Sequence, residues 1–246
     1  MSKSDKSVRA LQRVQRLLNL GRNEEAGRVA SQVITANPRN GPAWTLKAQS
    51  LLALKRYEQV LAAARAATTV APEAELPHRL TSIALSNLGR GRESATAASA
   101  AVDLAPRNWA THYLHGQTLL SVDCLDEAQA SAERAVALAP KRAEVHVGLG
   151  AIAAAQGRRD AAENSLRRAL ALDPDNAAAQ LRLSALGSRV RAKGLGVRIP
   201  VGDPANDREP RPNGRRSGRP LGRLLSPVIH LISLVPGSGT AADTNP

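Results

Sequence analysis

The chain has 246 residues and a formal net charge of +13, with 2% aromatic residues, no Phe and a single Cys. One cysteine excludes an internal disulfide and gives no metal-ligand spacing. Without large rings the core must be built from Ala, Leu, Val and Ile, which favours a thin layered array over one thick core.

Five prolines divide most of the chain into equal units. Pro38, Pro72, Pro106, Pro140 and Pro174 are each 34 residues apart. A constant spacing of this kind predicts an internal repeat. We therefore expect a disordered segment 1–6 and then five units over 7–176, with bounds 7–40, 41–74, 75–108, 109–142 and 143–176.

Each unit is expected to form two helices of about 12–14 residues, for example 76–88 and 93–104 in the third unit and 144–156 and 160–172 in the fifth. Small residues recur at fixed positions, as closely packed helices require. The three columns are Val14, Ala48, Ser82, Gly116 and Gly150; Ala26, Val60, Ser94, Ala128 and Ala162; and Val33, Ala67, Ala101, Ala135 and Ala169.

Helix ends are marked by two further columns. The first column holds Gly21, Lys55, Gly89, Asp123 and Gly157. A residue with a positive φ at this column would end the first helix of each unit. In that conformation Lys55 would lower the stability of the fold by about 1 kcal/mol relative to Gly. A second column holds Asn40, Asn108 and Asn176, where an amide can cap the next unit's first helix.

This 34-residue helix–turn–helix pattern resembles the tetratricopeptide repeat (TPR) family. The fifth unit carries the fullest set of matching residues: Leu149, Gly150, Gly157, Ala162, Ala169, Leu170, Leu172, Asp173, Pro174, Asp175 and Asn176. The resemblance implies an all-α fold, an α-solenoid of five TPR units. It also implies that the first helices line a concave groove that holds an extended peptide or a partner helix.

The array is expected to end in a capping helix over 177–193. Leu181, Ala185 and Leu186 continue the apolar pattern, and Arg182, Arg189 and Arg191 suit a polar outer side.

Residues 194–246 contain eight Pro and eight Gly, a composition typical of disorder. Residues 189–223 carry ten Lys/Arg against three Asp/Glu, and an apolar run follows at 224–235. Three interpretations of this tail stay open. It is a spacer; it contacts an anionic membrane surface, with the apolar run entering the interface; or it binds nucleic acid weakly. Nucleic acid is the least favoured, because no aromatic residue in the tail could stack on bases. The basic side chains available for either polyanion are Arg211, Arg215, Arg216, Arg219 and Arg223.

No catalytic constellation emerges. His78, His112 and His146 share a column with Trp44, which favours packing over metal binding. Acidic pairs such as Glu24/Glu25 and Asp126/Glu127 stand at helix starts, where they suit the helix dipole. We expect no cofactor, no metal and no enzymatic activity.

Two columns of the first helices would face the groove. One holds Leu11, Thr45, Arg79, Tyr113 and Val147; the other holds Gln15, Gln49, Ile83, Gln117 and Ala151. The glutamines at one column can donate to and accept from a peptide backbone.

The sequence thus predicts a non-catalytic protein-interaction scaffold or adaptor. The alternatives are a peripheral membrane adaptor anchored by 208–235 and, with less support, a regulatory subunit of an enzyme or a weak nucleic-acid binder. The oligomeric state is left open. The N-terminal 20 residues hold no apolar run of signal-peptide length, which predicts a cytoplasmic location, at the membrane surface in the adaptor alternative.

Overall fold

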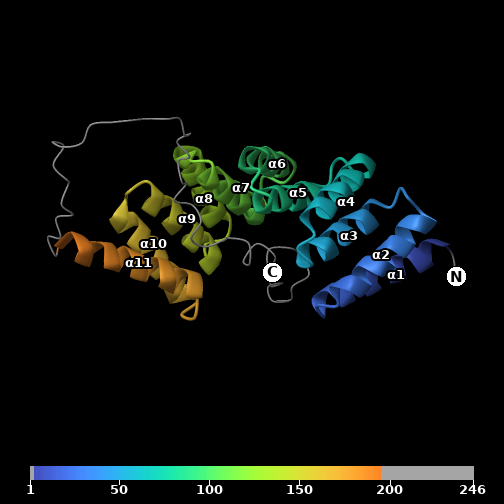
Figure 1. Ribbon diagram of the computed structural model, residues 1–246, viewed down its shortest axis with the longest axis horizontal. Coiled ribbons are helices and arrows are strands. Elements are labelled where there is room, and N and C mark those ends of the chain that lie inside the picture. Colours follow the sequence, from blue (N-terminus) through green and yellow to red (C-terminus); the bar gives the residue numbers. More distant parts are fainter. Residues whose placement is uncertain (1–2, 195–246) are drawn as a thin grey trace, which may run out of the picture.

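The structure is a computed structural model that describes residues 3–194, in which every regular element is a helix. Figure 1 shows these helices following one another along a row from the N-terminus to α11. In order they are α1 (Lys3–Asn19), α2 (Asn23–Ala36), α3 (Gly41–Ala53), α4 (Tyr57–Val70), α5 (Glu75–Asn87), α6 (Gly91–Leu104), α7 (Trp109–Ser121), α8 (Leu125–Leu138), α9 (Ala143–Ala155), α10 (Arg159–Leu172) and α11 (Ala177–Gly194).

The expected elements are found with small shifts at their ends. In the third and fifth units most helices begin or end one or two residues before the predicted bounds. The larger difference is at the start, where α1 begins at Lys3, although residues 1–6 were expected to be disordered. Asp5 stands in the first turn of α1, where its charge favours the helix dipole, and no Gly or Pro interrupts the segment.

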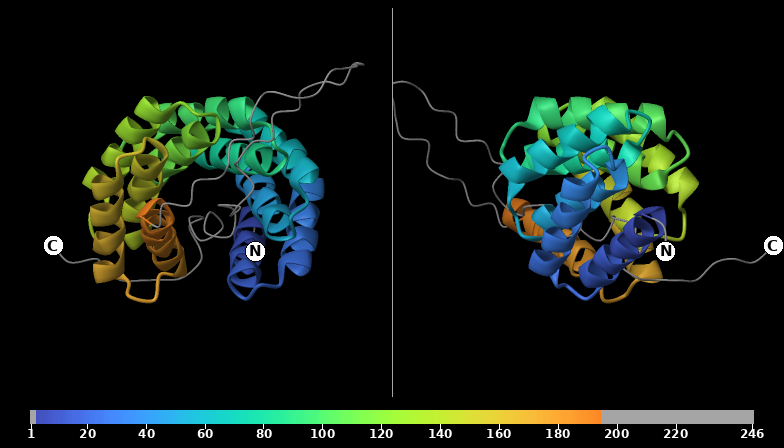
Figure 2. Two further views of the ribbon diagram at one scale, coloured as in Figure 1. Left: turned by 60° about the vertical axis from the view of Figure 1, so that its left-hand side comes forward. Right: turned by 90° about the vertical axis from the view of Figure 1, so that its right-hand side faces the viewer.

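The helices form an inner and an outer row. Each odd-numbered helix packs on the next odd-numbered helix, whereas the even-numbered helices make no comparable contacts with one another within residues 3–194. A row whose members are closer together must lie on the inside of a curve. Figure 2 agrees: the array bends into an arch, with α1 and α11 on the inner side of α2 and α10.

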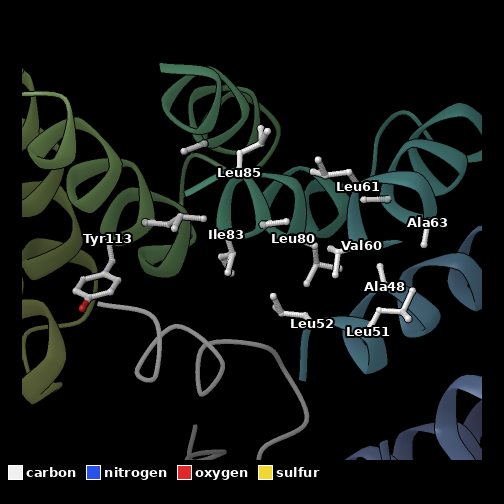
Figure 3. Packing of buried hydrophobic residues seen from close by; sticks show 14 of the residues in the cluster. Ala48, Leu51, Leu52, Val60, Leu61, Ala63, Leu80, Ile83, Leu85 and Tyr113 are labelled. Atoms are coloured by element: carbon white, nitrogen blue, oxygen red, sulfur yellow. The ribbon is translucent and has the colours of Figure 1, made fainter. Parts of the chain in front are cut away.

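The core follows the predicted small-residue columns. All fifteen members of the three columns are buried. The largest cluster is continuous over several units, with Leu52, Val60, Leu80 and Ile83 among its members (Figure 3). The small side chains let helix axes approach closely, as expected for an aromatic-poor chain.

The third unit has serine in two of these buried columns, and the two serines satisfy each other. Ser94 Oγ donates to the Ser82 carbonyl oxygen at 2.8 Å, and the two hydroxyl oxygens are 3.1 Å apart. The polar substitutions are therefore tolerated as a pair, because neither hydroxyl is buried without a partner.

The predicted helix ends are confirmed. Lys55 and Asp123 have φ values of 58° and 65°, in the same left-handed region as Gly21, Gly89 and Gly157. The oxygens of Asn40, Asn108 and Asn176 each accept a backbone N–H at 3.0 Å, from Ala43, Ala110 and Ala179.

The capping helix is present, but its faces differ from the prediction. Its buried side is formed by Ala179, Leu183 and Leu186, which pack on the apolar face of the fifth unit. Leu181 is 46% exposed, Ala185 is exposed and Arg182 is half-buried. The assignment of Arg182 to the outer side is therefore wrong, because α11 packs on α9 in the inner row and the charge of Arg182 acts on Tyr113 of α7.

The predictions for the tail lie outside the described residues; they concern the basic side chains of 211–223 and the apolar run 224–235. Within residues 3–194, no helix is both long enough and apolar enough to cross a bilayer.

Candidate partner-binding surface

The two predicted groove columns lie on the odd-numbered helices, which form the inner row of the arch. We call the surface formed by these columns the inner face. Its members repeat at the fifth and ninth positions of each 34-residue unit, and a spacing of four places each pair on one side of its helix. The exposure of these side chains varies along the array.

The N-terminal end of the inner face is partly open. Leu11, Gln15 and Thr45 are half-buried. Gln15 Nε2 donates to the Asn19 side chain at 3.2 Å, and Thr45 Oγ1 donates to the Gly41 carbonyl at 3.1 Å. Leu11 also lines a pocket of about 1030 Å³ between α1, α2 and the start of α3.

The middle of the inner face contains a buried charge. Arg79 is 1% exposed, and its Nη1 atom lies 3.5 Å from Glu75 Oε1. Asn108, which caps the start of α7, donates to the same carboxylate oxygen at 3.1 Å. Burial lowers the pKa of Arg79 and the negative Glu75 opposes this, so the ion pair helps to keep the guanidinium charged. Arg79 therefore belongs to a network that joins α5 to α7.

Tyr113 and Gln117 also pack within the array. A Cβ added to Gly148 of α9 would lie 2.9 Å from the Tyr113 ring and 3.0 Å from Gln117 Nε2, so both side chains rest on this glycine. Trp109 meets Tyr113 at a ring distance of 6.4 Å. Burial raises the pKa of Tyr113 to about 12, which keeps the phenol neutral.

The second column contains one incompletely paired amide. Gln49 is 6% exposed, and its Oε1 atom has no hydrogen-bond partner among residues 3–194. Ile83, Val147 and Ala151 give the rest of the columns an apolar character, and all three are buried. This part of the inner face is therefore mainly apolar and closed by packing, with one buried amide oxygen that no described residue pairs.

The inner face extends further than the ten predicted residues. Leu181 and Ala185 of α11 lie 34 residues after Val147 and Ala151, and both are exposed. Arg182 lies close enough to Tyr113 for its charge to lower the pKa of that phenol against the effect of burial. The 34-residue spacing is the sequence signal for these two positions, because it aligns them with the two columns, whereas the apolar pattern of the segment indicates only a cap.

The histidine column has a hydrogen-bonding role. Nε2 of His112 and of His146 lies 2.9 Å from the carbonyl oxygens of Pro106 and Pro140. The same bond is made by Trp44 to Pro38 at 2.9 Å and by Gln180 to Pro174 at 2.8 Å. Because a carbonyl only accepts, Nε2 must carry the hydrogen in both histidines.

Comparisons with known proteins agree with this geometry. Two models of the tetratricopeptide repeat family match residues 11–75 and 143–176. A thermophilic TPR protein of Thermus thermophilus is 21% identical, with a TM-score of 0.62 over 74% of this chain and 99% of that one. MamA of Desulfovibrio magneticus RS-1 is 18% identical, with a TM-score of 0.62 over 72% of this chain and 99% of its own.

A third solved structure is YrrB, described as a TPR protein with an unusual peptide-binding site. It is 16% identical, with a TM-score of 0.57 over 78% of this chain and 94% of that one. Among curated proteins, no sequence matches at a significant level. Repeat period, helix pairing, family models and fold agree: residues 11–75 and 143–176 match the tetratricopeptide repeat, and the described array has the α-solenoid fold of TPR proteins.

Proposed function

We propose that the protein is a non-catalytic interaction scaffold and that its inner face binds an extended peptide or a helix of a partner protein. The observation that carries this proposal is the continuous inner row of odd-numbered helices, along which two columns of mainly apolar and amide side chains repeat. TPR proteins are generally scaffolds without catalytic activity. The description of YrrB as a peptide-binding member of this fold supports the same class of ligand.

The chemistry of the inner face suits a peptide. Exposed apolar positions such as Leu181 can bury side chains of the partner, and the half-buried Gln15 amide can pair with its backbone. Leu181 is 46% exposed, so covering it contributes on the order of 1 kcal/mol, whereas the central positions are already buried. We therefore expect the exposed ends of the inner face to dominate recognition.

The experiment is affinity capture from the source cell with the full chain and two matched variants. Leu181→Glu places a charge on the inner face, and Leu20→Glu places the same charge on the turn between α1 and α2, where Leu20 is 70% exposed. We expect Leu181→Glu to reduce the recovered partner at least tenfold and Leu20→Glu to leave it unchanged. Equal recovery with both variants would contradict binding by the inner face.

A further inference from the structure

The exposed side of α1 carries a row of four cationic side chains. Its members, which we call the cationic stripe, are Lys6, Arg9, Arg13 and Arg16. All four are exposed, and their spacing of three or four residues places them on one face of the helix, in a row about 15 Å long. Leu11 and Gln15 of the inner face are each two residues from Arg13, roughly 200° around the helix. The stripe therefore lies on nearly the opposite side of α1 from the inner face.

The repeat shows what covers this side of the other first helices. α3, α5, α7 and α9 each pack on the second helix of the preceding unit, whereas α1 packs on α2 and α3 and no described helix precedes it. The positions aligned with Arg9 and Arg16 are buried in all four later units. They are Ala43, Pro77, Thr111 and Val145 in one column and Ser50, Ala84, Thr118 and Ile152 in the other. The stripe thus occupies the face on which every other first helix of the five units receives a helix.

Two contacts show how a helix is received at this face. A Cβ added to Gly27 of α2 would lie 3.0 Å from Ser50 Oγ of α3, and Ile152 of α9 packs in one cluster with Ala128 and Ala132 of α8. The aligned residue of α1 is Arg16, which presents a charge where the later units present a small or apolar side chain. A helix therefore fits this face of α1 by shape, and charge must supply the contact.

The charge of the stripe is not neutralised within residues 3–194. α1 has five Lys/Arg against one Asp, and no stripe residue forms a salt bridge with a described carboxylate. Glu25, on the adjacent α2, is already bonded to Arg22 at 2.6 Å; this bond lowers its pKa most, and the charge of Arg13 lowers it further. The pocket between α1, α2 and the start of α3 is lined by Lys6 and Arg39 and by no Asp or Glu. This end of the described array is thus positively charged.

The polarity that the end of a repeat array needs does not explain four like charges. Uncharged polar groups or mixed charges keep such an end soluble. α11, at the other end of the described array, has Gln180 and Ser184 among its exposed residues. Like charges three or four residues apart destabilise a helix, so the stripe lowers the stability of α1. An anionic partner would remove this repulsion.

We infer that the cationic stripe binds an acidic helix of a partner protein, which takes the place of a preceding second helix. The repeat provides the shape of the occupant, and the stripe determines its charge. A lipid surface suits the stripe less well, because the apolar residues Val14 and Leu17 of α1 are buried in the array and cannot enter a bilayer interface. The site is separate from the inner face, so this inference goes beyond the proposed function and does not depend on it.

The test is the fluorescence anisotropy of a labelled synthetic helical peptide mixed with the full chain. The probe peptide carries Glu at every third or fourth position along one face, with Ala and Gln elsewhere. A second peptide has the same composition with its Glu residues spread around the helix. We expect Arg9→Gln/Arg13→Gln/Arg16→Gln to raise the Kd of the probe peptide at least tenfold. The second peptide should bind the unchanged chain more weakly than the probe, and added salt should raise both Kd values, since exposed charges are screened.

The matched control removes three exposed arginines of the outer row and so has the same net charge as the stripe variant. It is Arg65→Gln/Arg134→Gln/Arg168→Gln, with one substitution on each of α4, α8 and α10. This control should bind the probe peptide as tightly as the unchanged chain, and replacement of the three stripe arginines by Lys should keep most of the affinity. Equal losses in the stripe and control variants, or equal binding of the two peptides, would overturn the inference.

Two further arms replace the peptide by vesicles that contain phosphatidylserine and by a DNA duplex. Binding of either one that depends on the stripe, without binding of the probe peptide, would assign the stripe to lipid or nucleic acid and overturn the acidic helix. Thermal unfolding followed by circular dichroism checks the fold of each variant. The stripe variant should unfold at an equal or higher temperature than the unchanged chain, because the repulsion along α1 is removed.

Discussion

The carbonyl oxygen of a repeat proline accepts a side-chain N–H from the first helix that follows it. Trp44, His112, His146 and Gln180 make this bond at 2.8–2.9 Å, each to the proline six residues earlier. Three side-chain types serve because each presents an N–H at a similar distance from the backbone. The proline thus ends one helix and anchors the start of the next unit.

Replacement of His146 should show how much of its contribution to stability comes from the hydrogen bond to the Pro140 carbonyl and how much from packing. His146 is 8% exposed, and we expect His146→Ala to lower the free energy of unfolding by about 1 kcal/mol more than His146→Gln, since Gln makes this bond at position 180. Urea denaturation of both variants measures the difference. Equal losses would mean that only packing matters at this column.

Lys55 stores strain that glycine would remove. Its φ of 58° lies in the left-handed region, where a side chain costs about 1 kcal/mol. We expect Lys55→Gly to raise the free energy of unfolding by up to that amount and Lys55→Ala, which keeps a Cβ, to leave it nearly unchanged. Thermal unfolding tests this, and a gain of the same size with Ala would point to charge as the cause.

His115 should make stability depend on pH. Burial, followed by the nearby charge of His112, lowers its pKa, and Ser131 Oγ lies 3.1 Å from its Nδ1. Below about pH 6.5 the unfolded chain takes up a proton more readily than the folded one, so this residue makes stability fall as pH drops from 7 toward 5.

His115→Gln should flatten that part of the pH dependence. The measurement is the urea midpoint at several pH values between 5 and 8. An unchanged slope would show that His115 titrates alike in both states.

Two helical glycines, Gly150 and Gly187, allow the effect of close helix packing to be distinguished from the effect of intrinsic helix propensity. A Cβ on Gly150 would lie 2.9 Å from Leu166 Cγ and 3.2 Å from the Ala162 carbonyl oxygen, whereas nothing lies within 4 Å of such an atom on Gly187. Gly187→Ala should stabilise the chain by about 1 kcal/mol through helix propensity.

Gly150→Ala should instead destabilise the protein, because α9 and α10 would have to move apart. Thermal unfolding of the two variants compares the same substitution in two environments. A gain at both positions would show that the α9–α10 contact can relax around a methyl group.

The helices and their buried columns could be predicted because a repeat places residues with the same packing role at the same position. The burial of the inner face could not, because it depends on how closely one first helix approaches the next. Gly148 shows the reason: Leu46, Leu80 and Leu114 occupy its position in three earlier units, and glycine here leaves room for Tyr113 and Gln117. The sequence shows the change from leucine to glycine at this position, but the burial of Tyr113 and Gln117 that follows from it depends on the curvature of the array.

For the molecule as a whole, the curvature of the array leaves the ends of the inner face accessible and buries its centre. The ends of the inner face remain accessible at Thr45 and Leu181, while Arg79, Ile83 and Tyr113 join neighbouring helices. Substitution of the central residues would disturb the array as well as any binding, so exposed positions give the cleaner tests. We therefore expect ligand contacts at the exposed ends of the inner face, whose centre is stabilised by the packing of the array.

The most direct test of binding by the inner face is photo-cross-linking from single positions of the full chain. A photoreactive side chain at Thr45 lies on the inner face, and one at Ala62, an exposed position on α4, lies in the outer row. We predict that a partner protein is captured covalently from position 45 and not from position 62. Adducts from position 62 alone, or equally from both, would contradict it.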